Sequence, residues 1–149
     1  MAFRMETIQR LRELTGAGVM DCKKALEEAG GDFDAAAAIL RSKGATKAAK
    51  RADRATAAGV VECYVHQDRV GVVVVLRSET DFVARSEPFR ELAHTIAMQI
   101  AAMGGETADA VLAQEYIRDS SRTVSDLVND VIARTGENIT LGEFYRVEL

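Results

Sequence analysis

Residues 59–76 read GVVECYVHQDRVGVVVVL, and this stretch decides the class of fold. Over residues 61–66 apolar and polar side chains alternate with a period of two, which is the pattern of a β-strand with two different faces. Residues 69–76 are rich in valine and predict a second strand. Only two residues, Gln67 and Asp68, separate the strands, so the stretch predicts a β-hairpin.

Toward the C-terminus, the pattern continues with helices and a third strand. Apolar spacing predicts a helix over residues 87–103 and another from Thr123 to Gly136. Residues 139–149 alternate again, whereas residues 108–121 are ambiguous between a short helix and a loop. The order β-β-α-α-β predicts an α+β fold, with a three-stranded antiparallel sheet and helices packed on one of its faces.

Before the hairpin, the chain predicts a small helical bundle. The three helices span residues 5–14, 19–29 and 33–43, and glycines follow each of them. Asp32 is a typical N-cap for the third helix, and Gly44 is expected to end it. Residues 45–58 are rich in alanine and basic side chains without an apolar stripe, which predicts an exposed helical linker.

Charge also divides the chain near Gly59. Residues 1–58 carry 11 basic and 8 acidic side chains, whereas residues 59–149 carry 8 basic and 15 acidic ones. We therefore expect three parts: a three-helix docking module at 1–44, a basic helical linker at 45–58 and an α+β core, which also dimerises, at 59–149.

Composition excludes several classes of protein. The chain has 149 residues, of which 48% are hydrophobic, and a formal net charge of -4. The longest strongly apolar run, residues 72–76, is far shorter than the roughly 18 residues of a membrane-spanning helix. The first residues lack the apolar stretch of a secretory signal, so we expect a cytoplasmic protein with no membrane partner. An acidic chain also makes direct nucleic-acid binding a poor first hypothesis.

Three possible chemical sites are not favoured. Residues 16–18 (GAG) with Lys23 resemble a phosphate-binding loop, but Cys22 occupies the position before the lysine where that motif needs glycine. Cys22 with His66 or His94 could form a nucleophilic pair, but Cys22 lies on the apolar face of its predicted helix, which favours a buried structural thiol. The cysteines and histidines lack zinc spacing, so we expect no metal and no cofactor.

Phe82 is unusual because it is an aromatic residue in a polar segment. It follows Glu79 and Asp81, two carboxylates with no evident partner base. It could be a core contact made from a loop, or an exposed apolar residue that binds a partner. The sequence leaves both open.

The basic stretch from Lys43 to Arg54 could bind nucleic acid or an acidic partner. It has no interleaved aromatic residues, so a solvated helix face is favoured.

Two motifs resemble the elongation factor Ts family. The first is residues 11–32, LRELTGAGVMDCKKALEEAGGD, which is similar to the family's opening three-helix module of the ubiquitin-associated type. The second is residues 79–85, ETDFVAR, followed by AMQIA at 97–101 and GENI at 136–139. Many family members carry two methionines where this chain has Val19 and Met20. The resemblance covers nearly the whole chain.

The resemblance implies a function without catalysis of its own. Members of the family bind the GDP form of elongation factor Tu, a translational GTPase, and accelerate the release of GDP. By resemblance, Phe82 enters between helices of the GTPase domain and Asp81 disturbs its magnesium site. The complete set of implied contact residues is Thr80, Asp81, Phe82 and Val83 in the second motif, with Leu14, Val19 and Met20 in the N-terminal module.

The resemblance is to the short form of the family, which has a single core unit. Short forms pair to restore the double core of the long forms, so the resemblance implies a homodimer through the sheet. The alternative function is an adaptor that binds a ubiquitin-like protein or nucleic acid through the three-helix module and the basic linker.

Overall fold

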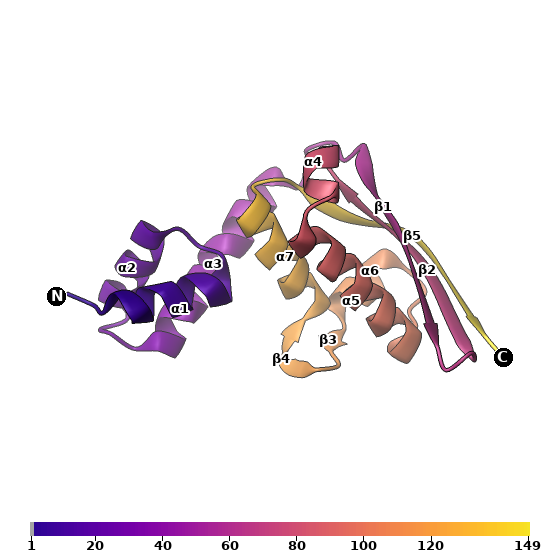
Figure 1. Cartoon of the computed structure of the whole chain (residues 1–149), viewed down its shortest axis with the longest axis horizontal. Helices are drawn as coiled ribbons and strands as arrows, with labels where there is room; N and C mark the ends of the chain where they lie inside the picture. Colours follow the sequence, from indigo (N-terminus) through magenta and orange to yellow (C-terminus); the bar gives the residue numbers. More distant parts are fainter. Residues whose placement is uncertain (1) are drawn as a thin grey trace.

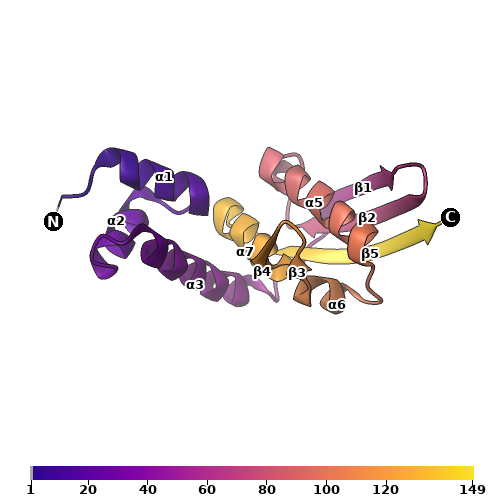
Figure 2. The ribbon, with the colours of Figure 1, turned by 90° about the horizontal axis from the view of Figure 1, so that it is seen from below.

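The computed structural model describes residues 2–149 and has the α+β fold that the sequence predicts. Figure 1 shows an elongated molecule, with the N-terminal helices at one end and the sheet and C-terminus at the other. Figure 2, turned by 90°, shows the same order of parts. No helix among residues 2–149 is long and apolar enough to cross a membrane.

The N-terminal part is the predicted three-helix bundle. Its helices are α1 (Met5–Thr15), α2 (Val19–Glu28) and α3 (Phe33–Arg51). Their apolar faces meet in a small core in which Leu11, Leu26 and Ala36 are fully buried. The predicted N-cap is confirmed, because the Asp32 carboxylate accepts a hydrogen bond from the N–H of Ala35 at 2.8 Å.

The third helix is longer than the sequence predicts. The expectation that it ends at Gly44 is wrong, because α3 continues to Arg51. Gly44 lies beside α7 (Val124–Thr135), where a Cβ on this glycine would lie 3.6 Å from the Cβ of Ala133. Ala48 is buried within the core of the sheet unit. The alanine-rich segment is therefore not wholly exposed, and α3 contributes to both hydrophobic cores.

The predicted hairpin and third strand form one antiparallel sheet. Its strands are β1 (Ala58–His66), β2 (Val70–Ser78) and β5 (Ile139–Glu148), in the order β1-β2-β5. Residues 67–69 form the connection: Gln67 and Asp68 have positive φ, as the central residues of a tight hairpin turn require, and the N–H of Arg69 donates to the His66 carbonyl at 3.0 Å. The C-terminal strand pairs with β2, so the central strand is the valine-rich one.

The remaining helices lie on one side of the sheet, as predicted (Figure 1). They are α4 (Asp81–Ala84), α5 (Glu87–Met103), α6 (Ala108–Ala113) and α7. Val74 of the sheet and Phe89 and Ile96 of α5 are fully buried between the layers. Burying such a side chain contributes about 1.5–3 kcal/mol, so this layer is the main source of stability for the core.

The ambiguous segment contains α6 and a second hairpin. The short strands β3 (Glu115–Tyr116) and β4 (Asp119–Thr123) pair with each other. The buried side chain of Gln99 in α5 holds this hairpin: its amide donates to the carbonyl of Glu115 at 3.0 Å and accepts from the N–H of Ile117 at 3.1 Å. The two residues of β3 and the five polar residues of β4 show no apolar–polar alternation by which a strand could be recognised from sequence.

Candidate functional site

Residues 80–83, which the sequence singles out, lie in a tight turn between β2 and α5. Thr80 is the N-cap of α4: its Oγ1 accepts a hydrogen bond from the N–H of Val83 at 3.3 Å. The hydroxyl of Ser78 donates to the Thr80 carbonyl at 2.9 Å. The chain is thus fixed on both sides of Thr80 before the helical turn begins.

The turn separates its apolar side chains. Val83 and Ala84 are buried in the core, whereas Asp81 is exposed and Phe82 is 85% exposed. Successive residues of a helix point about 100° apart, so burying Val83 turns Phe82 toward solvent. The structure therefore excludes the interpretation of Phe82 as a core contact and leaves it as an exposed aromatic ring.

Glu137, in the loop between α7 and β5, supports the turn. One of its carboxylate oxygens accepts the backbone N–H of Thr80 at 2.9 Å, and the other accepts the Thr80 hydroxyl at 2.7 Å. Charge-assisted hydrogen bonds of this kind are about twice as strong as neutral ones. In the sequence, the only signal for Glu137 is its membership of the GENI motif.

Glu79, which precedes Thr80, and Asn138, which follows Glu137, make a second contact between the same two segments. The backbone N–H of Asn138 donates to the Glu79 carboxylate at 2.7 Å, and the Arg54 guanidinium lies 3.6 Å from the same oxygen. The sequence shows no evident partner for the Glu79 carboxylate. In the structure its carboxylate instead joins the residues around the turn to the end of the alanine-rich segment.

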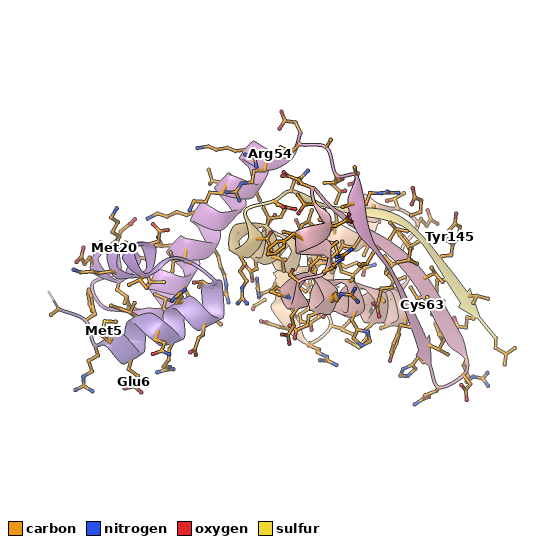
Figure 3. The ribbon with its side chains drawn as sticks, turned by 45° about the horizontal axis from the view of Figure 1, so that its top comes forward. Met5, Glu6, Met20, Arg54, Cys63 and Tyr145 are labelled. Atoms are coloured by element: carbon orange, nitrogen blue, oxygen red, sulfur yellow. The ribbon has the colours of Figure 1, made fainter. Side chains whose placement is uncertain are left out.

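The three N-terminal residues of the candidate site are also at the surface. Leu14 lies in the last turn of α1, Val19 and Met20 begin α2, and all three side chains are exposed although they are apolar. Figure 3 shows Met20 at the surface of the helical bundle. Helix ends joined by the short GAG loop thus place apolar side chains in water, where they are free to contact a partner.

The possible nucleophilic pair does not form. Cys22 is fully buried in the N-terminal bundle, and this burial raises the pKa of its thiol. His66 belongs to β1 and contacts the Tyr64 hydroxyl at 2.9 Å, and His94 belongs to α5 and contacts the Glu62 carboxylate at 3.3 Å. Among residues 2–149 no group of three potential metal ligands comes together.

Several basic side chains of the 43–54 stretch are engaged with carboxylates. Lys43 lies 3.2 Å from Glu28, and Lys47 lies 3.9 Å from Asp21. Arg54 is beside Glu79, as described above. These pairings reduce the positive potential that a nucleic acid would meet and agree with a solvated helix face.

The outer face of the sheet is apolar and uncovered. Its exposed side chains come from all three strands and are Val61, Cys63, Val65, Val73, Tyr145 and Val147. Cys63 pairs in register with Val73, and Val73 with Tyr145, so the side chains form a row across the sheet. Figure 3 shows Tyr145 on the side of the sheet that faces away from the helices.

Comparisons with known proteins agree with the motifs. The family model described as Elongation factor TS matches residues 79–149, which include the turn and Glu137. A protein named Elongation factor Ts from Nitratidesulfovibrio vulgaris is 41% identical over 195 aligned positions, covering 100% of this chain and 98% of that protein. Proteins of the same name from Thermotoga petrophila and Leptospira biflexa are 39% and 42% identical, covering 100% of this chain and 97% and 98% of theirs.

The alignments also reveal a difference in length. The comparison with the Nitratidesulfovibrio vulgaris protein spans 195 positions, whereas this chain has 149 residues, a difference of 46. About 46 positions of that relative therefore have no counterpart here, although both proteins are covered nearly from end to end.

Proposed function

Because this chain belongs to the elongation factor Ts family and is thus a translation elongation factor, we propose that it is a guanine nucleotide exchange factor for elongation factor Tu. It binds the GDP form of that GTPase and accelerates the release of GDP, so that GTP can bind. It performs no covalent chemistry and needs no cofactor of its own.

The exposed ring of Phe82 is the observation that carries this proposal. An aromatic side chain that is 85% exposed contributes little to folding, but it can become a main source of binding energy once a partner buries it. Its backbone is already held by the Thr80 cap and by Glu137, so binding requires little further ordering. Phe82 inserts between helices of the GTPase domain.

Asp81 acts beside Phe82. Its carboxylate is exposed and forms no ion pair with a side chain of residues 2–149. When Phe82 inserts, Asp81 reaches the neighbourhood of the magnesium ion that holds the phosphates of GDP. A carboxylate there competes for the ion and its water ligands, which weakens the hold on the nucleotide.

The magnitude required is within reach of one aromatic contact. Exchange is a negative coupling between two ligands of the same protein, and weakening GDP a thousandfold requires about 4 kcal/mol. A buried aromatic hot spot contributes about 2–4 kcal/mol, so Phe82 can supply much of the coupling. Leu14, Val19 and Met20 supply affinity by docking the N-terminal helices on the same GTPase domain.

The active assembly is a homodimer through the outer face of the sheet. Three paired strands of nine, nine and ten residues present a face of about 400 Å², and apolar patches of this size are often functional surfaces. Two copies related by a twofold axis would cover this row of side chains with each other. The dimer would present two turns to two GTPase molecules.

Stopped-flow release of a fluorescent GDP from elongation factor Tu tests the exchange function. The wild-type chain should accelerate release, and Phe82→Ala should lower the exchange rate constant by about 30-fold or more, in line with the loss of a hot-spot aromatic. Phe82→Leu should retain part of the activity, because leucine keeps an apolar side chain at the tip of the turn.

Ile117→Ala is the matched control, since Ile117 is an exposed apolar residue at the tip of the β3-β4 hairpin. It should exchange GDP at the wild-type rate. Near wild-type exchange by Phe82→Ala would refute the insertion of Phe82, and no acceleration by the wild-type chain would refute the exchange function.

A further inference from the structure

The two surfaces proposed to contact the GTPase belong to different hydrophobic cores that share one helix. The first half of α3 packs in the N-terminal bundle through Ala36, Ala37 and Leu40, and its later part reaches the other core through Ala48. A helix of 19 residues spans about 28 Å, so a small change in its direction moves Leu14 and Met20 by several ångströms relative to Phe82. What fixes this direction therefore matters for binding.

Asn138 fixes the C-terminal end of α3. Its side chain is only 3% exposed, and its amide donates to the carbonyls of Arg54 at 2.9 Å and Ala52 at 3.4 Å. Carbonyl groups at and just beyond a helix end have no partner within the helix and need such donors. The backbone N–H of the same residue binds Glu79, so one buried asparagine connects the end of α3 to the segment that leads into the Phe82 turn.

Arg134 of α7 connects the N-terminal bundle to the core at a second point. It lies near the end of α7, and its guanidinium donates to the carbonyl of Glu13 in the last turn of α1 at 2.9 Å. Its aliphatic stem lies against Gly16, where a Cβ would overlap the Cγ of Arg134. A cation at the C-terminal end of a helix is also favoured by the helix dipole. Arg51 of α3 adds a third contact, to the carbonyl of Ile132 at 3.3 Å.

We infer that Asn138 and Arg134 are positioning residues that hold the N-terminal docking surface and the Phe82 turn in one fixed arrangement. Neither side chain belongs to the proposed contact surfaces, and each joins segments more than 80 residues apart in the chain. This inference rests on the proposed function. When Leu14, Val19 and Met20 dock, the fixed arrangement places Phe82 at its own site at high effective concentration. Loss of the Asn138 and Arg134 contacts would leave both surfaces intact, but docking of one would no longer place the other at its site.

The first experiment asks whether Arg134 acts through docking. The slope of the GDP-release rate against the concentration of this protein is measured for wild type, Arg134→Ala, Met20→Asp and the double variant. Arg134→Ala should lower the slope by about 5- to 20-fold in the wild-type background but less than about twofold in the Met20→Asp background, where docking no longer helps to place Phe82.

Arg134→Lys is the conservative control. Lysine keeps an aliphatic stem over Gly16 and a donor for the Glu13 carbonyl, so it should stay within about twofold of wild type. An equal loss from Arg134→Ala in both backgrounds would overturn the inference, because it would show an effect independent of docking. No loss in either background would overturn it as well.

The second experiment needs no GTPase, so it tests the positioning role of Asn138 and Arg134 independently of the proposed function. Nitroxide labels on Lys24→Cys and Ser120→Cys, in a chain with Cys63→Ser, report the distance between α2 and the β3-β4 hairpin by pulsed electron paramagnetic resonance. The distance distribution should be narrow in wild type and should broaden with Arg134→Ala and with Asn138→Ala. If the distance distribution kept its width in both variants, with helix content retained by circular dichroism, the positioning role would be overturned even if the protein were active in exchange.

Discussion

Glu137 gives both oxygens of one carboxylate to Thr80 and thereby supports the turn that carries Phe82. Glu137→Ala removes two charge-assisted hydrogen bonds, so Phe82 loses part of its fixed direction. We expect the maximal rate of GDP release to fall by about 5- to 10-fold, with little loss of thermal stability because the pair is exposed. Stopped-flow exchange at saturating protein and a thermal melt measure the two effects.

Glu28→Ala is the matched control for this variant. Glu28 is also an exposed glutamate with a single partner, Lys43, but it lies at the far end of α2 from Met20. It should leave exchange within about twofold of wild type. If Glu137→Ala exchanged GDP as fast as Glu28→Ala, the turn would not depend on Glu137.

Sequence patterns predict residues in long periodic segments better than residues in short turns. The hairpin at Gln67–Asp68 follows from strand alternation and from the length of the connection. The direction of Phe82 could not be predicted in the same way, because α4 has only four residues and its burial pattern is set by contacts across the chain. For the same reason the contact between Glu137 and Thr80, 57 residues apart, leaves no local signal.

At the scale of the element, Gly44 shows how packing can override a local stop signal. Glycine weakens a helix, and the sequence therefore predicts a helix end there. In the structure α3 passes through Gly44 because its continuation packs on α7 and buries Ala48. A Cβ at Gly44 would meet Ala133 at an ordinary van der Waals distance of 3.6 Å, so the site has room for a methyl group.

Gly44→Ala should therefore stabilise the protein. Alanine is favoured over glycine in a helix interior by about 0.8–1.0 kcal/mol, which corresponds to a rise in Tm of about 2–4 °C for a chain of this size. Differential scanning calorimetry measures the change. Gly16→Ala is the contrasting variant: Gly16 has a φ of 69° and the Arg134 stem occupies the space of its Cβ, so this substitution should lower Tm. A fall in Tm with Gly44→Ala would show that α3 and α7 approach more closely than the structure indicates.

At the scale of the whole molecule, the apolar outer face of the sheet is the feature that a single chain leaves unexplained. Tyr145 is 73% exposed, and on the same face it lies beside Val147 in β5 and Val73 in the central strand. Because the proposed dimer axis relates identical surfaces, one substitution places two changes in the interface. Tyr145→Asp would bury two carboxylates without partners, which costs several kcal/mol and should weaken the dimer by about 100-fold or more.

Sedimentation equilibrium over a range of protein concentrations measures this change. The wild-type chain should sediment as a dimer at micromolar concentrations, and Tyr145→Asp as a monomer, while helix content stays close to wild type because the residue is exposed in the single chain. Ile117→Asp places the same charge on an exposed apolar residue of the β3-β4 hairpin, away from the sheet face, and should remain dimeric. Two results would contradict assembly through the sheet: a wild-type chain that is still monomeric at about 100 times these micromolar concentrations, or a Tyr145→Asp chain that still dimerises. In either case the apolar row on β1, β2 and β5 would not be what joins two copies.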